Sequence, residues 1–207
     1  SLCYIDDTGK MGINVANPAA SLDIKGIGAT NATSSLVIKN SSNVELLKVR
    51  DDGTSVLKAD TVINGVTVGK GKSSLTSNTA VGDLALNSVT TGDGNTAVGR
   101  LTLRFNTTGN NNVSIGNGAL ASNIDGSNNV GLGLQALAAN ISGSGNMAIG
   151  ANALMSNTGS NNVGIGTNAL FSNTTGTANV ALGTSAMTYN TTGTANVALG
   201  TSAMTYN

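Results

Sequence analysis

Residues 162–207 read NVGIGTNALFSNTTGTA, NVALGTSAMTYNTTGTA and NVALGTSAMTYN, which is one 17-residue unit written three times. Residues 174–190 and 191–207 are identical. The unit can be followed back through eight copies, spaced by 17 residues except for one spacing of 16. The copies start at Asn78, Asn95, Asn112, Asn129, Asn146, Asn162, Asn179 and Asn196. A unit this short cannot bury a core of its own, so the repeat predicts coils that stack on one another.

Numbering each unit from its first asparagine gives the pattern N-V-A-I-G-x-x-A-L-x-x-N-T-T-G-x-x. The fifth position is glycine in every copy. This glycine predicts a bend or a left-handed backbone that a Cβ would prevent. The structural repeat glycines are Gly82, Gly99, Gly116, Gly133, Gly150, Gly166, Gly183 and Gly200.

Positions two to four predict a short strand in each unit. Position four is always Val, Ile or Leu and position two is mostly Val or Thr, so we expect both to face the core. Position three is small in every copy, from Ala80 to Ala198, and we expect its face to pack against another chain. Ala at position eight and Leu or Met at position nine predict a second short strand with one large core residue.

Asparagine at position twelve, followed by Thr-Thr-Gly or a variant, is typical of a turn. One unit therefore reads as strand, glycine bend, strand and turn, and the fold class is all-β: a fibrous β-solenoid or β-roll of 17-residue coils. Coils would stack at ~4.8 Å, with a Val/Ile/Leu ladder inside and asparagine ladders at the turns. We expect almost no helix, except one turn at the Ala-Leu positions.

The composition fits a thin, repetitive β structure. Aromatic residues make up 2% and charged residues 10% of the 207 residues, while hydrophobic residues reach 39%, too many for a disordered chain. The net charge of zero disfavours nucleic acid and anionic membrane as partners. No apolar run is long enough for membrane insertion, and the single cysteine, Cys3, has no partner for an intrachain disulfide. We expect the chain to be a fragment of a longer protein.

Charge divides the chain into two predicted domains. Residues 1–77 hold 15 of the 20 charged residues and residues 78–207 hold five. The first part is predicted to be a β-hairpin region, and the second the eight-unit solenoid. Predicted hairpins join residues 35–39 to 44–49, and 61–63 to 66–68 across Asn64-Gly65. Residues 69–77 are predicted to be a polar linker.

Motifs that suggest chemistry have structural explanations in this chain. The absence of histidine excludes a Ser-His-Asp arrangement and a histidine-based metal site. The GxGxxA matches at residues 131–136 and 164–169 belong to repeat units without a βαβ frame, and Gly71-Lys72-Ser73 lacks the first glycine of a phosphate-binding loop. We therefore predict no enzymatic activity and no catalytic, cofactor-binding or metal site.

Two other patterns, the acidic residues of the repeats and the N-glycosylation pattern, could also suggest a functional site. The only acidic residues of the repeats are Asp83, Asp93 and Asp125, which occupy different unit positions and so would not stack into a catalytic pair. The N-glycosylation pattern Asn-X-Ser/Thr reads as turn chemistry, and matters only for a eukaryotic or eukaryotic-virus source. It occurs at Asn31, Asn40, Asn106, Asn112, Asn140, Asn173 and Asn190.

Three segments together resemble known fibres. MGINVANPAASLDIKG (11–26) resembles the VGIGTTNPxxxLDVxG segment of phage and viral tail-fibre proteins, and LVIKNSSNVELLKVRDDGT (36–54) resembles the β-hairpins of the same shafts. The NVAIGxxALxxNTTG units resemble the head repeats of trimeric autotransporter adhesins and repeats of virus-encoded fibres. The resemblance implies a homotrimer, an extracellular or virion location, and attachment to a host surface.

We therefore expect a non-enzymatic structural shaft of a virion or phage tail fibre. Its expected partners are two further copies of itself, virion or tail proteins and, through a distal tip, a host surface glycan or receptor. A trimeric adhesin on the bacterial cell surface is the alternative. A glycan-cleaving tailspike is a third reading, which predicts turnover that is lost on changing the three aspartates.

Overall fold

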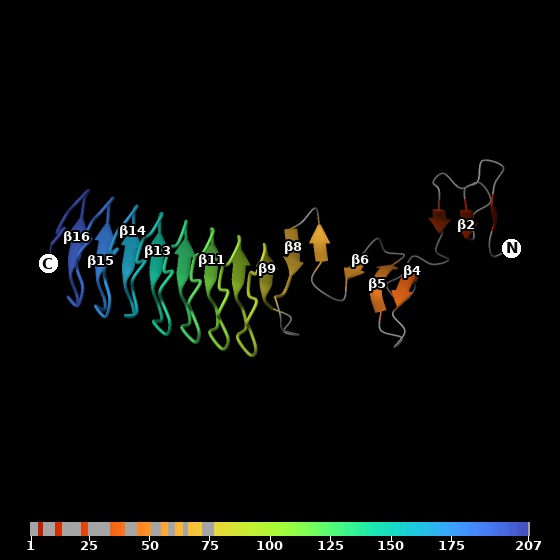
Figure 1. Cartoon of the computed structure of the whole chain (residues 1–207), viewed down its shortest axis with the longest axis horizontal. Helices are drawn as coiled ribbons and strands as arrows, with labels where there is room; N and C mark the ends of the chain where they lie inside the picture. The colour runs from red at the N-terminus through yellow and green to blue at the C-terminus, as the bar shows by residue number, and fades with distance from the viewer. Residues whose placement is uncertain are drawn as a thin grey trace. The chain divides into compact units, whose positions relative to one another are not determined.

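The computed structural model describes residues 66–71 and 77–206 and, outside these ranges, the strands β1 to β7. The chain divides into two compact units, Ser1–Ala59 and Asp60–Asn207, which are described separately below. Figure 1 shows the strands of both units and contains no helix among the described residues, so the predicted all-β class is confirmed.

The first unit contains two small sheets. In one, β2 pairs with β1 antiparallel and with β3 parallel. In the other, β5 pairs antiparallel with both β4 and β6, which confirms the hairpin predicted for residues 35–39 and 44–49. The bounds are β1 (Tyr4–Ile5), β2 (Met11–Ile13), β3 (Leu22–Ile24), β4 (Ser34–Lys39), β5 (Glu45–Arg50) and β6 (Ser55–Leu57). Cys3, Asn31, Asn40 and the turns between these strands lie outside the described residues.

The second unit is a β-solenoid with one strand per repeat. Its eight parallel strands are β9 (Thr79–Val81), β10 (Thr96–Val98), β11 (Val113–Ile115), β12 (Val130–Leu132), β13 (Met147–Ile149), β14 (Val163–Ile165), β15 (Val180–Leu182) and β16 (Val197–Leu199). Each pairs with the next in register, so that Val180 lies opposite Val197 and Ala181 opposite Ala198. Equal repeat positions therefore stack along the sheet, as the periodicity predicts.

An antiparallel hairpin extends this sheet at its N-terminal end. β7 (Thr61–Ile63) pairs with β8 (Val66–Gly69), and β8 pairs antiparallel with β9, with Val68 opposite Val81. This confirms the hairpin predicted across Asn64-Gly65. The hairpin belongs to the same compact unit as the coils, whereas charge alone had grouped it with residues 1–77. Residues 72–76 of the predicted linker, which include Lys72 and Ser73, lie outside the described residues.

The strands face the opposite way from the prediction. The small residues of position three point into the solenoid: Ala97, Ser114 and Ala148 are fully buried. The larger residues of positions two and four lie on the outside, where Ile115 is 44% exposed. The predicted Val/Ile/Leu ladder inside the coil is therefore wrong, as is the contact of position three with another chain. The alternation of large and small residues shows that the two faces of each strand differ, but it does not show which face points into the solenoid.

The interior is filled instead from the other side of the coil. Position nine is a fully buried ladder of Leu86, Leu103, Leu120, Leu137, Leu154, Leu170 and Met187. Because these long side chains occupy the narrow interior, only Ala, Ser or Gly fits opposite them at position three; a Cβ on Gly164 would lie 3.2 Å from Leu154 Cγ. The predicted core role of position nine is confirmed.

The second predicted strand does not form. Two consecutive tight turns take its place, in which Ala119 N–H donates to Gly116 O (3.3 Å) and Asn123 N–H donates to Leu120 O (3.2 Å). Leu120 has φ +50°, and its counterparts in the other coils share this left-handed backbone. Bonds between coils continue along these turns, since Leu120 N–H donates to Ala136 O (2.9 Å). Each coil thus has one strand, and the consecutive turns that follow it are called the turned side below.

The repeat glycines form the bend after each strand. Their φ values lie between +119° and +136°, where a residue with a Cβ is strained. Space is also lacking, because a Cβ on Gly133 would lie 2.6 Å from Gly150 O of the next coil. Glycine thus supplies both the backbone conformation and the close approach of successive coils.

Two buried asparagine ladders connect the coils, as the sequence predicts. At position one, Asn129 Oδ1 accepts hydrogen bonds from the backbone N–H (2.9 Å) and Nδ2 (3.2 Å) of Asn146. At position twelve, Asn123 Oδ1 accepts from Asn140 Nδ2 (2.9 Å). Within one coil, Nδ2 of both asparagines donates to the same carbonyl, as Asn129 and Asn140 do to Gly143 O (2.8 and 2.9 Å). These bonds satisfy buried amides and close each coil.

The 16-residue unit interrupts the position-twelve ladder. Its turn reads Asn157-Thr158-Gly159, one residue shorter than the others. Asn157 Nδ2 donates to Gly159 O (2.8 Å), and Asn140 Oδ1 of the preceding coil is buried without a hydrogen-bond partner. The position-one ladder continues through the same coil, because Asn162 N–H donates to Asn146 Oδ1 at 3.0 Å. The missing residue is therefore accommodated at the turn alone.

Candidate interaction surfaces

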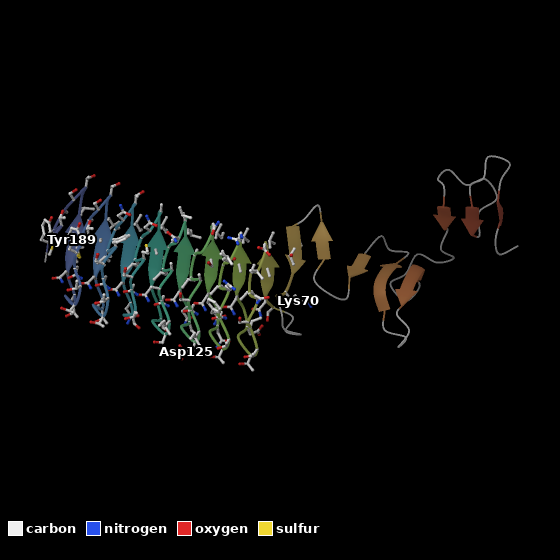
Figure 2. All side chains as sticks on the ribbon, in the orientation of Figure 1. Lys70, Asp125 and Tyr189 are labelled. Atoms are coloured by element: carbon white, nitrogen blue, oxygen red, sulfur yellow. The ribbon has the colours of Figure 1, made fainter. Side chains whose placement is uncertain are left out.

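The three aspartates of the solenoid lie in different surroundings. Asp83 pairs with Arg100 (3.3 Å) on the surface, where both side chains are more than half exposed and the pair adds little stability. Asp93 accepts a hydrogen bond from the Ser77 hydroxyl, and Asp125 lies in a turn at the edge of the stack (Figure 2). The described residues contain no cluster of three or more His, Cys, Asp or Glu side chains suited to a metal ion.

The segments that match a dinucleotide fingerprint are parts of coils. Gly131 lies in β12, Gly133 forms the following bend, and Ala136 is buried in the turned side. No helix follows either match, since residues 77–206 contain none. Within the described residues there is also no helix long and apolar enough to cross a membrane.

The glycosylation patterns of the solenoid lie inside it. Their five asparagines are fully buried and belong to the two ladders: Asn106, Asn112, Asn140, Asn173 and Asn190. Asn112, for example, donates from Nδ2 to Asn95 Oδ1 (3.1 Å) and to Gly126 O (2.8 Å). A glycan on such a nitrogen would prevent these bonds and would not fit the coil. The interpretation of these patterns as local structure therefore agrees with the fold.

The outer side of strands β9 to β16, called the strand face below, is an apolar surface. It consists of the residues at positions two and four, which are mainly Val, Ile and Leu. Met147 is 37% exposed and Ile115 is 44% exposed, while Val197 and Leu199 at the last coil reach 68% and 77%. Eight strands spaced by ~4.8 Å give this surface a length of about 35 Å. A continuous apolar surface of this kind is typical of a protein–protein contact.

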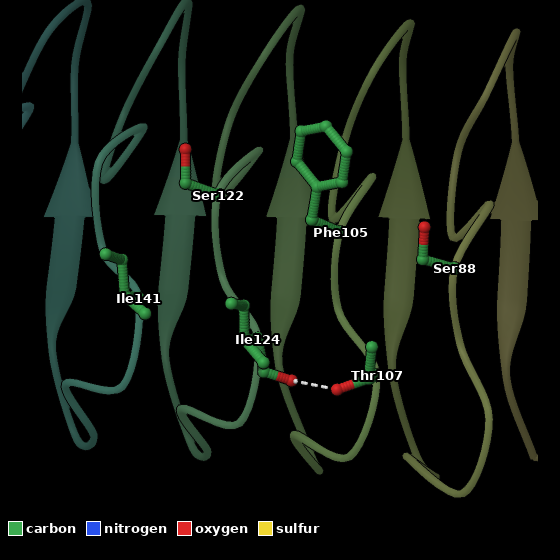
Figure 3. A pocket seen from close by; sticks show the side chains of 6 residues that line it. All are labelled: Ser88, Phe105, Thr107, Ser122, Ile124 and Ile141. Carbon is green, nitrogen blue, oxygen red and sulfur yellow. Dashed lines mark hydrogen bonds between the residues drawn. The ribbon is translucent and has the colours of Figure 1, made fainter.

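A second apolar surface, the turn groove, lies on the turned side of the coils. It is lined by Ser88, Phe105, Thr107, Ser122, Ile124 and Ile141 and has a volume of about 410 Å³ (Figure 3). It arises where the sequence departs from the repeat, because Ile124 and Ile141 replace the usual Thr at position thirteen. The Thr107 hydroxyl is engaged by the next coil, donating to Ile124 O at 3.1 Å.

Aromatic side chains are stacked or paired at two places on the turned side. The rings of Tyr189 and Tyr206, at position eleven of consecutive coils, stack with centroids 5.1 Å apart. The Arg104 guanidinium lies 4.8 Å from the centre of the Phe105 ring, a cation–π contact beside the turn groove. The Tyr stack shows that the coil spacing brings equal side chains into contact outside the core as well as within it.

Neither surface was located from the sequence. The residues of the strand face were recognised but assigned to the core, and the volume of the leucine at position nine was the signal that could have corrected this. The turn groove was missed, although Ile at position thirteen of two adjacent units marks it.

No family model, curated protein or solved structure matches the chain.

Proposed function

We propose that the chain is a structural shaft segment of a virion or phage tail fibre, in which three copies pack together to form a stiff spacer for host attachment. The observation that carries this proposal is the strand face, a straight apolar surface repeated at every coil. Packing against copies of the chain would remove it from water. The number three comes from the resemblance to tail fibres and to trimeric adhesin heads.

Stiffness follows from the way the coils are joined. Backbone bonds, the position-one asparagine ladder and the close approach of the glycines link successive coils, and the position-twelve ladder adds to them wherever it is continuous, so bending would have to break several contacts at once. Within residues 77–206 no aromatic side chain is buried in the interior, and the coils offer few charged sites to partners. Such a structure is suited to holding a receptor-binding tip at a distance rather than to catalysis.

The assembly can be tested by multi-angle light scattering of the full chain. We expect three times the chain mass of 20.4 kDa. Changing both Ile115→Glu and Met147→Glu would place charges on the strand face, and we expect monomers because unpaired carboxylates are costly to bury in a contact. A monomeric parent chain would contradict the homotrimer.

The matched control carries Thr108→Glu and Thr175→Glu, which add the same two charges at exposed turn positions. We expect it to keep the parent mass. Circular dichroism of all three proteins separates loss of assembly from loss of fold. If the strand-face variant remains trimeric and folded, the strand face is not the contact between copies.

The alternative function is that of a trimeric bacterial surface adhesin, favoured by the likeness of the repeat units. An antibody against residues 78–207 distinguishes the two by immunoelectron microscopy of the source material. Labelled fibres on virus or phage particles support the tail-fibre shaft, and label on a bacterial cell surface supports the adhesin.

The glycan-cleaving tailspike is tested by incubating the assembly with host polysaccharide. We expect no release of reducing ends. Turnover that disappears in the Asp83→Asn, Asp93→Asn or Asp125→Asn variant would instead make the chain an enzyme.

A further inference from the structure

The turn groove combines an apolar lining with a cation at its edge. The side chains of Phe105, Ile124 and Ile141 lie on three consecutive coils (Figure 3), and they are 46%, 43% and 48% exposed. Beside them, the Arg104 guanidinium lies 4.8 Å from the centre of the Phe105 ring. The groove volume of about 410 Å³ falls within the usual range of small-molecule sites, about 300–1,000 Å³. The groove therefore has the size and the mixed chemistry of a ligand site.

The cation of this groove has no acidic partner among the described residues. The other arginine of the solenoid, Arg100, pairs with Asp83, whereas no carboxylate of residues 77–206 forms an ion pair with Arg104. Arg104 Nε is buried, and no described residue accepts its hydrogen bond. A buried donor on a charged group costs free energy until an acceptor or counter-charge approaches it. The guanidinium therefore favours an anion, and a carboxylate matches its planar fork.

The apolar residues of the groove are not required by the coil. Position thirteen is Thr in the other complete units, and its hydroxyl joins two coils, as Thr158 does by donating to Thr174 O at 2.9 Å. Ile124 and Ile141 give up this bond. Phe105 likewise replaces the serine that both neighbouring units carry at position eleven. Three departures from the repeat, none of which the stacking needs, thus meet at one place on the surface.

The short length of the groove indicates the kind of partner. Its end residues Ser88 and Ile141 belong to the coils from Asn78 and Asn129, so it crosses four coils and is about 14 Å long. A second copy lying along the turned side would contact every coil, yet position thirteen is polar again from Thr158 onward. The strand face, by contrast, is apolar at every coil. A short ligand therefore fits the groove better than another chain does.

We propose that the turn groove binds a free medium-chain fatty acid, whose acyl chain lies along Phe105, Ile124 and Ile141 and whose carboxylate pairs with Arg104. With carbon–carbon bonds of about 1.5 Å at tetrahedral angles, an extended chain of about ten carbons spans about 12 Å, close to the length of the groove. The acyl chain would cover the exposed apolar side chains, and the carboxylate would supply the missing counter-charge. The site lies on one chain, so this proposal does not depend on the fibre function or on the number of copies.

The test titrates the full chain with sodium decanoate below its micelle concentration. Isothermal titration calorimetry measures the affinity, and we expect saturable binding with a Kd below about 1 mM. NMR of the isoleucine methyl groups locates the ligand. The methyl signals of Ile124 and Ile141 should shift, whereas Ile115 on the strand face serves as the internal reference and should shift much less. Absence of saturable binding, or shifts confined to Ile115, would overturn the proposal.

The role of the cation is tested with two ligands and two variants. Decyltrimethylammonium carries the same ten-carbon chain with the opposite charge, and it should bind at least about tenfold more weakly than decanoate. Arg104→Met keeps an apolar side chain over Phe105 and should weaken decanoate binding at least about fivefold. The matched control, Arg100→Met, removes the same charge from the same coil outside the groove and should change the affinity by less than about twofold. Equal affinities for both ligands, or for both variants, would mean adsorption to apolar surface alone and would refute the site.

The apolar lining is tested by restoring the repeat. The double change Ile124→Thr and Ile141→Thr introduces the residue that the other units carry at position thirteen, so the coils should still stack. Decanoate should then bind at least about tenfold more weakly, because two large apolar contacts are lost. Circular dichroism confirms that the variant is folded. If the folded variant binds decanoate as tightly as the parent chain, the acyl chain does not lie in the turn groove.

Discussion

Leu120 and its counterparts from Leu86 to Met187 combine two features that rarely occur together, a left-handed backbone and complete burial. A left-handed conformation costs an L-residue about 1–2 kcal/mol, whereas full burial of a leucine contributes about 1.5–3 kcal/mol. Burial therefore exceeds strain, and the turned side can carry a core residue. Sequence reasoning placed this leucine in the core correctly and its backbone in a strand incorrectly, because leucine gives no local signal for positive φ.

Two glycines of one coil should respond oppositely to the same change. Gly131 lies in β12, and a Cβ there would approach Leu120 at an ordinary 3.4 Å. Gly131→Ala should stabilise by about 0.4–1 kcal/mol, because alanine reduces the freedom of the unfolded chain. Gly133→Ala should destabilise by about 1–3 kcal/mol or more, since its φ is +136° and the added Cβ would lie 2.6 Å from Gly150 O. Urea unfolding measures both, and similar effects would contradict the positions assigned to the bend and the strand.

At the scale of the coil, the periodicity predicted stacking, the strand at positions two to four and the asparagine ladders. It could not say which strand face is inside, because a period of two describes both faces equally. The answer depends on volume: a coil of this size has room for the leucine at position nine or for large strand residues, and not for both. The hydrogen-bonded turns could not be predicted for a related reason, because the Ala-Leu sequence at positions eight and nine is compatible with several backbone conformations.

The shortened coil offers a test of the position-twelve ladder. Inserting one Thr between Thr158 and Gly159 restores the 17-residue spacing, and Asn157 Nδ2 should then donate to Asn140 Oδ1. Satisfying this buried oxygen should stabilise the protein by about 1–3 kcal/mol in urea unfolding.

The complementary deletion should have the opposite effect. Removing Asp125 shortens another coil and should separate Asn123 Nδ2 from Asn106 Oδ1, which it now contacts at 2.7 Å. We expect a loss of similar size, about 1–3 kcal/mol. If the insertion destabilises or the deletion has no effect, the interruption at Asn157 is not a defect of the ladder.

At the scale of the whole solenoid, stability comes from contacts between neighbouring coils and hardly from charge. Residues 78–207 contain five charged side chains, and Asp83 and Arg100 form an exposed pair. The cohesion lies in backbone bonds, buried amides and the alanine–leucine interior, none of which involves charged groups. The low charge was evident from composition, whereas the strand face and the turn groove required the coordinates because both depend on which side chains point outward.

Salt should therefore have little effect on the folded solenoid. Raising NaCl from about 0.05 to about 1 M should change the melting temperature by no more than about 4 °C, because exposed ion pairs contribute at most about 1 kcal/mol. Asp83→Asn should be equally mild, within about 0.5 kcal/mol. A melting temperature that falls steeply with salt would indicate that electrostatic contacts hold the coils together.

The fixed interior has a consequence for how such a chain can vary. Positions three, five, eight, nine and the two asparagines determine the coil, whereas positions six, ten, eleven and thirteen carry residues as different as Asp83, Arg104, Tyr189 and Ile141. Substitutions at these outer positions leave the backbone unchanged and sit on a lattice with an axial spacing of ~4.8 Å. The surface residues of the solenoid can therefore change during evolution, while the residues that determine the backbone of the coil stay the same.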